Sequence, residues 1–297
     1  MSWWRRQKAA NPEAPDREVV EGNCSALGTL WDGFDELFES MPAEQWSSPF
    51  GPDWVFADVP HHLAAFDSQF IAAALEGRER RFELAAPADL DRWARDASAR
   101  RPHDPSESLA AWRAARARII AALETMSDAD LQRMAWYPAL WVRGERPLAV
   151  HLELLRVHTI QTALETEFRL GREDSFVDSA TIAAFIQGYM GFLPLLANSD
   201  VAAGREFTAV WRITGPEGGM WTLTTAGGHA QLHPGDTPGA DLEIVESADA
   251  YLRIATGVWN LVEAVADGRI SVSDPEQFQH LLALLAPASP DIPTPVM

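Results

Sequence analysis

The segment HLELLRVHTIQTALE, from His151 to Glu165, carries two histidines within a helical pattern of apolar residues. In a helix, residues three, four and seven apart share a face, which places His151, Leu154 and His158 along one side. Neutral imidazole is a common metal ligand and also exchanges a proton near neutral pH. One turn before His158, where a second ligand from the same helix is expected, the sequence has Leu154. The pattern therefore indicates a functional site but leaves open whether it binds a metal or transfers protons.

A second candidate segment, PDWVFADVPHHLAAF, runs from Pro52 to Phe66. As a helix it places Asp58 and His62 one turn apart, so His62 can point inward while the adjacent His61 points elsewhere. Two bundle helices that each bring an imidazole to the interior can hold a divalent metal. We predict that His62 and His158 form this pair. His61 and His151, taken singly, are more typical of surface or hydrogen-bonded core histidines.

The elements that position these residues follow from the spacing of apolar residues. This spacing is helical from about residue 18 to 170, with a break at the proline- and glycine-containing segment MPAEQWSSPFGPDW. A proline starts and a glycine stops the helix that carries His158. Four long helices with apolar stripes predict a four-helix bundle. They span about residues 23–41, 55–76, 106–126 and 147–171.

After Gly171 the pattern changes. A helix over about 178–197 precedes strand-like segments rich in β-branched and aromatic residues, EFTAVWRITG, GMWTLTTAGGHAQLHPG and ADLEIVES. Two short helices, the strand RISVS and a final helix complete a small α+β domain. The predicted organisation is a flexible arm (1–17), an all-α bundle (18–172), a bridging helix and linker (173–202), the α+β domain (203–287) and a loose tail (288–297).

Composition narrows the classes of partner. The formal net charge of −19 disfavours nucleic acid and anionic membranes, because such a field repels polyanions. No apolar run approaches the length of a membrane span, and no signal-like segment begins the chain. The single cysteine, Cys24, excludes an internal disulfide and reads as a helix-face hydrophobe. We expect a cytoplasmic protein with a small-molecule substrate; its oligomeric state stays open.

Four motifs, in this order, resemble the mycothiol-dependent maleylpyruvate isomerase family. After Trp46, the pattern Trp-x-x-x-Asp-x-x-x-His-Leu matches Trp54, Asp58, His62 and Leu63. RPLAVHLELLRVHTIQTALE is similar to the family's Glu-x-x-x-His helix, with His158 on the histidine. ITGPEGGMWTLT and DGRISVSDPEQFQHLL resemble parts of its second domain. Over about residues 18–285 the resemblance implies a DinB-like four-helix bundle followed by a small sterol-carrier-like α+β domain.

The resemblance also implies metal ligands at His62, at position 154 and at His158. Leu154 has no donor atom, and Gln161 stands where a further acidic residue commonly follows the histidine. Catalytic sites of this kind normally use three protein ligands and a water. Either a substitute completes the site, or the chain holds no metal. The candidate substitutes are Glu153, Glu165, His61 and His151.

Three functions remain open at this stage. With a zinc-like metal, the resemblance implies a mycothiol-type thiolate that adds to an electrophilic double bond, in an isomerase or S-transferase. Arg212 and Arg156 are candidates for a carboxylated substrate, and Trp54 and Arg156 for cofactor contacts. Without metal, His62 and His158 can act as acid and base in an isomerase or cyclase. A third function is non-catalytic binding of a hydrophobic ligand, in a pocket that Trp136 and Trp141 could line.

Overall fold

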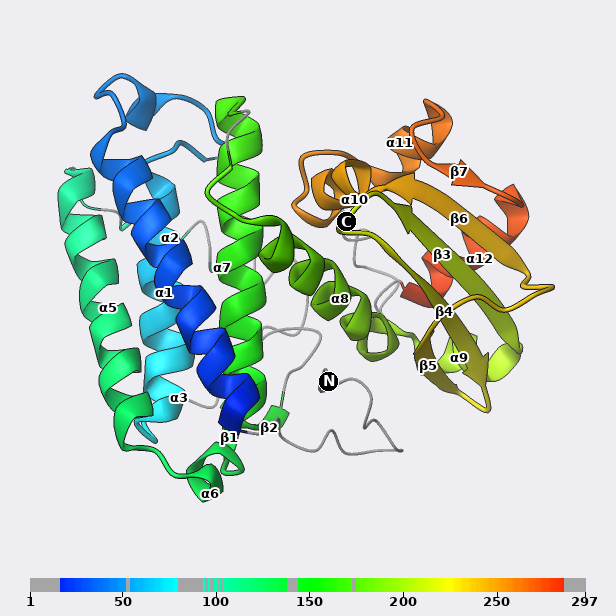
Figure 1. Ribbon diagram of the computed structural model, residues 1–297, viewed down its shortest axis with the longest axis horizontal. Coiled ribbons are helices and arrows are strands. Elements are labelled where there is room, and N and C mark those ends of the chain that lie inside the picture. Colours follow the sequence, from blue (N-terminus) through cyan, green and yellow to red (C-terminus); the bar gives the residue numbers. More distant parts are fainter. Residues whose placement is uncertain are drawn as a thin grey trace. The chain divides into compact units, whose positions relative to one another are not determined.

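The computed structural model describes residues 17–51, 54–79, 93, 96, 99–100, 102, 104–137, 144–172 and 175–285. Its contacts divide the chain into two compact units, Met1–Thr159 and Ile160–Met297 (Figure 1). The division falls inside the helix α7 (Leu148–Leu170) rather than in a loop. The boundaries expected from the sequence at residues 172 and 202 stay predictions.

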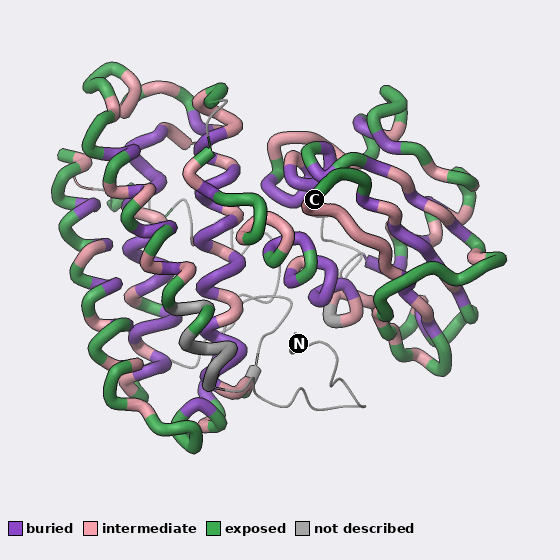
Figure 2. Tube along the Cα trace, viewed as in Figure 1, coloured by how far each residue is buried: buried purple, intermediate pink, exposed green. Residues whose placement is uncertain are grey.

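Four helical rods make up the first unit, as predicted. They are α1 (Arg17–Glu39), α2 (Asp58–Phe66) with its continuations, α5 (Pro105–Thr125) and α7. The rods lie side by side, and their buried residues fall on the faces turned toward one another (Figures 1 and 2). Phe34 of α1 and Trp112 of α5 are fully buried and meet edge to face, with ring centroids 5.3 Å apart. The apolar stripes read from the sequence therefore form the core of a helical bundle.

The ends of the helices follow ordinary capping chemistry. Asp104 accepts a hydrogen bond from the backbone N–H of Ser106, and Pro105 takes the first helical position of α5. Gly171 follows the last residue of α7 and ends this helix with a φ angle of 64°. Glycine adopts this left-handed conformation at little energetic cost.

The second rod is not α-helical throughout. After α2, a π-helix runs over Asp67–Ala72 (η3), and a last α-helical turn covers Ala73–Leu75 (α3). Asp67 is fully buried, and its carboxylate accepts a 2.7 Å hydrogen bond from the indole N–H of Trp112 in α5. Short π segments inside α-helices often occur near functional sites.

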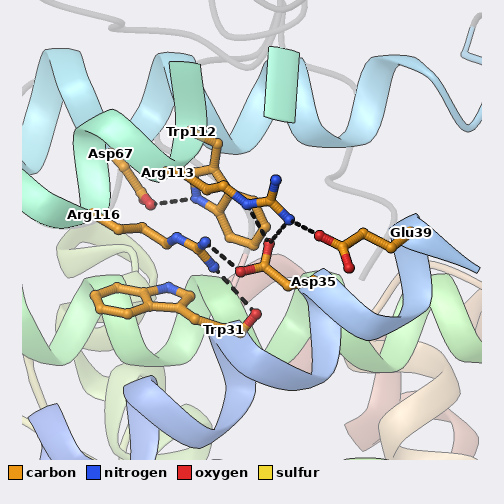
Figure 3. A network of polar contacts seen from close by, with 7 residues as sticks. All are labelled: Trp31, Asp35, Glu39, Asp67, Trp112, Arg113 and Arg116. Atoms are coloured by element: carbon orange, nitrogen blue, oxygen red, sulfur yellow. Dashed lines mark hydrogen bonds and ion pairs between the residues drawn. The ribbon is translucent and has the colours of Figure 1, made fainter. Parts of the chain in front are cut away.

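A polar network ties α1 and α5 together (Figure 3). The Arg116 guanidinium donates to Asp35 at 2.7 Å and to the backbone oxygen of Trp31 at 3.1 Å, and it lies 4.4 Å from the Trp112 ring centroid. Arg116 is buried, so this pairing keeps its charge from being left without a counter-ion.

Some elements of the first unit were not predicted. A 3₁₀ turn covers Gln45–Ser47 (η2), and α6 (Asp128–Leu131) precedes an antiparallel hairpin of β1 (Met134–Tyr137) and β2 (Gly144–Pro147). The hairpin lies within residues 18–170, where the spacing of apolar residues predicted only helices. Its strands are four residues long, too short to show a strand period against the flanking helices.

The second unit contains the predicted sheet. Its strands are β3 (Phe207–Thr214), β4 (Gly219–Ala226), β5 (His229–Pro234), β6 (Leu242–Ser247) and β7 (Ser271–Val272), in the order β5-β4-β3-β6-β7. β3 pairs with β6 in parallel and the other pairs are antiparallel. Its helices are α8 (Ser179–Leu196), α9 (Ser199–Gly204), α10 (Ala248–Ala255), α11 (Leu261–Ala266) and α12 (Pro275–Leu285). Only α9 lacks a predicted counterpart.

In the part of the chain that the structure describes, no helix is long and apolar enough to cross a membrane.

Candidate active site

The imidazole rings of His62 and His158 meet inside the first unit. His62 comes from α2 and His158 from α7, and their Nε2 atoms lie 2.9 Å apart, within hydrogen-bond distance. For neutral rings, one Nε2 must carry the proton and donate it to the lone pair of the other. The sequence predicted that these two residues converge, and the structure brings them into direct contact.

Aromatic side chains surround the histidine pair. Phe66, one turn after His62, stacks on the His158 ring with centroids 3.8 Å apart. Trp54 approaches the His62 ring edge to face at 5.0 Å, and Trp93 lies 6.0 Å from the same ring. As whole residues, His62 and His158 are half-buried, but the Nδ1 atoms of both rings are buried.

Burial keeps both imidazoles in their neutral forms. It lowers the pKa of His62 to about 4, with a smaller contribution from the neighbouring charge of His61. Burial, followed by the charge of His62, places the pKa of His158 well below its ordinary value. The Nδ1 atom of His62 is buried and finds no hydrogen-bond partner among the described residues. At neutral pH the pair is therefore an uncharged unit that can accept a proton.

The other two candidate imidazoles do not join the pair. His151 is fully buried, its Nδ1 lies 3.2 Å from the backbone oxygen of Pro147, and its ring packs against Tyr137 at 5.3 Å. His61 is half-buried next to His62. The interpretation of His151 as a hydrogen-bonded core residue thus agrees with its contacts.

The acidic candidates for a third metal ligand are engaged in ion pairs. Glu153 binds Arg156 through two contacts, 2.5 and 3.1 Å, and this pair is largely buried. Glu165 pairs with Arg169 at 2.8 Å. Among the described residues, no cluster of three or more His, Cys, Asp or Glu side chains is arranged to hold a metal ion. With Leu154 at the remaining position, the donor set around His62 and His158 does not fit a three-ligand metal site.

The arginine candidates are also paired. Arg156 is buried with Glu153, so its guanidinium is committed to a neighbour on its own helix. Arg212 belongs to the second unit, where it donates to Asp236 at 2.6 Å and contacts Glu243 and the sulfur of Met220. The roles assigned to these arginines from the sequence stay predictions.

Four further residues were named from the sequence, Trp136, Trp141, Cys24 and Gln161. Trp136 is half-buried on β1, while Trp141 and the side chain of Cys24 lie outside the described residues. Gln161 donates its side-chain N–H to the backbone oxygen of Ala255, at 2.9 Å, within the second unit.

Sequence reasoning missed several residues of the site. Phe66 was noted only for its spacing, and Tyr137 and Trp93 gave no signal because their neighbours in space are remote in sequence. Asp67 did give a sequence signal, because it is the single carboxylate within the mostly apolar segment AAFDSQFIAAA. Burial raises the pKa of Asp67 to about 7, against the opposing effects of the hydrogen bond from Trp112 and the charge of Arg116.

Comparisons with known proteins place the fold. Residues 26–162 match the family model of the DinB superfamily. No curated protein matches the chain by sequence. The structure of a histidine-to-alanine variant of mycothiol-dependent maleylpyruvate isomerase is 11% identical over 86% of this chain and 92% of that one, with a TM-score of 0.52. The unsubstituted isomerase is 12% identical over 80% of this chain and 89% of that one, with a TM-score of 0.49. Sterol carrier protein domain 2 of Helicoverpa armigera is 18% identical over 35% of this chain and 85% of that one, with a TM-score of 0.29.

The DinB match and the variant isomerase structure, with its TM-score of 0.52, confirm the resemblance inferred from the sequence at the level of the fold. The chain combines a DinB-like helical domain with a sheet-containing C-terminal region.

Proposed function

Residues 26–162 match the family model of the DinB superfamily, and the chain shares its fold with a mycothiol-dependent maleylpyruvate isomerase; from this premise we propose a thiol-dependent isomerase or S-transferase. In this proposal His62 and His158 carry out the proton transfers without a metal held by three protein ligands. One observation carries it, the 2.9 Å approach of the two Nε2 atoms among aromatic side chains. The substrate is a small electrophilic metabolite.

The two histidines act as one proton acceptor. A thiol proton passes to the Nε2 atom whose lone pair is free once a ligand separates the rings, and the second Nε2–H steadies the charge that develops nearby. The pocket disfavours an isolated imidazolium, as the low pKa of His62 indicates. An adjacent anion supplies the missing counter-charge, so the imidazolium forms only when a ligand is bound.

A bound small-molecule thiol, mycothiol in the related isomerase, supplies a nucleophile that adds reversibly to an activated double bond. His62 and His158 then hold the proton at Nε2 until it returns. If it returns to sulfur as the adduct breaks down, the net result is isomerisation. If it passes to carbon, the thioether remains and the net result is S-transfer.

A second candidate function uses the same pair directly. Phe66, Trp54 and Trp93 give the site largely apolar walls, which favours an apolar substrate whose carbon acid is deprotonated and reprotonated by the histidines. This is a metal-independent isomerase or cyclase that requires no thiol. Dependence of turnover on added thiol distinguishes it from the first.

The test measures thiolate formation and turnover together. We expect mycothiol to show increased thiolate absorbance in the ultraviolet on binding, and maleylpyruvate or a related unsaturated acid to isomerise only when the thiol is present. His62→Gln and His158→Gln should abolish both signals. His61→Gln, next in sequence but outside the pair, is the matched control and should retain them. Thiolate formation that survives in both histidine variants refutes the proposal.

A further inference from the structure

A second, independent site lies in the second unit. Residues of β3, β6, α8, α10, α11 and α12 line a cavity of about 50 Å³. Its walls are almost entirely apolar or aromatic, and one side chain carries a carboxyl group, Glu246. The other titratable groups that line it are Tyr189 from α8 and Tyr251 from α10, whose ring centroids lie 6.4 Å apart.

Glu246 stands where the strand pattern calls for an apolar residue. Along β6, Leu242, Ile244 and Glu246 alternate onto the buried face of the sheet, while Glu243 and Val245 are half-buried. Only 6% of Glu246 is exposed, and its Oε2 atom has no hydrogen-bond partner among the described residues. Buried carboxyl groups are normally paired or hydrogen-bonded, so this one calls for an explanation.

The surroundings keep Glu246 in its acid form. None of the described residues that line the cavity is an arginine, lysine or histidine. Burial alone raises the pKa of Glu246 to about 8, and it also raises the pKa of Tyr189 to about 12. Burial, Tyr189 and Glu246 together raise the pKa of Tyr251 well above its usual value. At neutral pH the cavity therefore presents uncharged hydroxyl donors in an apolar enclosure.

We propose that this cavity binds a small, uncharged, mainly apolar ligand whose carbonyl or ether oxygen accepts a hydrogen bond from the Glu246 carboxyl group. An uncharged acceptor satisfies the lone O–H without burying a charge. A carboxylate ligand would bring an anion into a site that lacks a cationic partner. A cationic amine would require Glu246 to ionise in the surroundings that oppose it. The cavity volume restricts the ligand to a few heavy atoms unless leucine side chains of α12 move.

The experiment uses the full-length protein and three ligands of similar shape: cyclopentanone, cyclopentylamine and cyclopentanecarboxylate. Ligand-observed NMR should detect binding of the ketone and weaker or no binding of the two charged analogues. Raising the pH from about 6 to about 9 should weaken ketone binding by about tenfold, because Glu246 then loses the donated proton. Tighter binding of the amine at high pH would overturn the proposal in favour of a cation site.

Two substitutions at Glu246 separate the hydrogen bond from the shape of the cavity. Glu246→Gln keeps a neutral donor, so ketone binding should persist and lose its dependence on pH. Glu246→Leu removes the donor and should weaken ketone binding by about tenfold. Glu263→Gln, an exposed change on α11, is the matched control and should leave the affinity and its pH dependence as they are. Equal ketone binding by the native protein and the leucine variant would refute the inference, and none of these outcomes bears on the histidine pair.

Discussion

The Nε2 atoms of His62 and His158 lie 2.9 Å apart although the residues are separated by 96 positions in the chain. Each ring is also packed against an aromatic neighbour, Trp54 for His62 and Phe66 for His158. This arrangement accommodates neutral imidazoles and penalises charged ones, since two imidazolium ions would face each other across a hydrogen-bond distance. The stability of the fold should therefore depend on their protonation.

We predict that acidification destabilises the protein through His62. Its folded pKa of about 4 is below the ordinary value of 6.5, so the unfolded chain binds the proton more readily. The stabilisation is complete above about pH 6.5 and is lost as the pH falls toward 4. The expected loss is about 2 to 3 kcal/mol. Urea unfolding at a series of pH values measures it.

The His62→Gln variant should show much less of this acid-induced loss, because glutamine does not titrate. His61→Gln is the control and should retain nearly all of it. Part of the loss remains in His62→Gln because burial also lowers the pKa of His158. If the native protein and His62→Gln lose stability in parallel between about pH 6.5 and 4, His62 makes no contribution of this kind.

Restoring a carboxylate one turn before His158 should create a metal site. Leu154→Glu would supply the third ligand that the chain lacks, on the same helix face as His158. We expect this variant to bind about one zinc or cobalt ion per chain, and the native protein to bind the same ions far more weakly. Elemental analysis of untagged protein and the visible spectrum of the cobalt form provide the measurement.

Leu154→Gln tests whether the added charge is responsible. Glutamine has nearly the same shape as glutamate but is a poor ligand, so metal content should stay at the native level. Stoichiometric metal in the native protein would show instead that a ligand outside the described residues completes the site.

Removing Arg116 should destabilise the bundle far more than removing Arg113. Both guanidinium groups contact Asp35, but Arg116 is buried over the Trp112 ring whereas the Arg113 side chain is 40% exposed (Figure 3). Arg116→Met leaves Asp35 without its buried partner and should cost about 3 kcal/mol or more. Arg113→Met should cost less than about 1 kcal/mol. Chemical denaturation of both variants at one pH makes the comparison, and equal losses would contradict it.

The long helices could be predicted because their apolar spacing repeats over several turns. The convergence of His62 and His158 followed from placing each on an inward face of its helix. The β1–β2 hairpin could not be predicted from the sequence. Its short strands lie between helical segments and include residues such as Arg146 and Pro147, which are not typical of strands.

Residues brought together only by the tertiary fold could not be read from the sequence. Trp93 packs against His62 from a distant segment of the chain, and Glu246 faces the cavity because residues of β6 alternate onto the buried face of the sheet. In the sequence, ADLEIVES shows only a strand ending in acidic and polar residues. Which carboxylate is buried depends on the register of pairing, and a shift of one residue would expose Glu246 and bury Glu243 or Val245 instead.

Asp67 should affect the pH dependence of stability in the direction opposite to His62. Its folded pKa is raised to about 7 from an ordinary value of 3.8, so the folded protein holds the proton more tightly than the unfolded chain. The stabilisation is present below about pH 3.8 and is lost as the pH rises through 7. Asp67→Asn keeps the acceptor oxygen for Trp112 but cannot ionise, so its stability relative to the native protein should increase between about pH 4 and 8.

Because the windows of His62 and Asp67 overlap with opposite signs, the native protein can show a flat pH profile even though both groups titrate abnormally. The single variants should therefore tilt the profile in opposite directions, His62→Gln toward greater stability in acid and Asp67→Asn toward greater stability near and above neutral pH. In the double variant the two tilts should cancel, leaving the acid-induced loss that comes from His158. Asp32→Asn, exposed on α1, should leave the native profile unchanged. Profiles of the two single variants that tilt the same way would show that burial does not control these two groups independently.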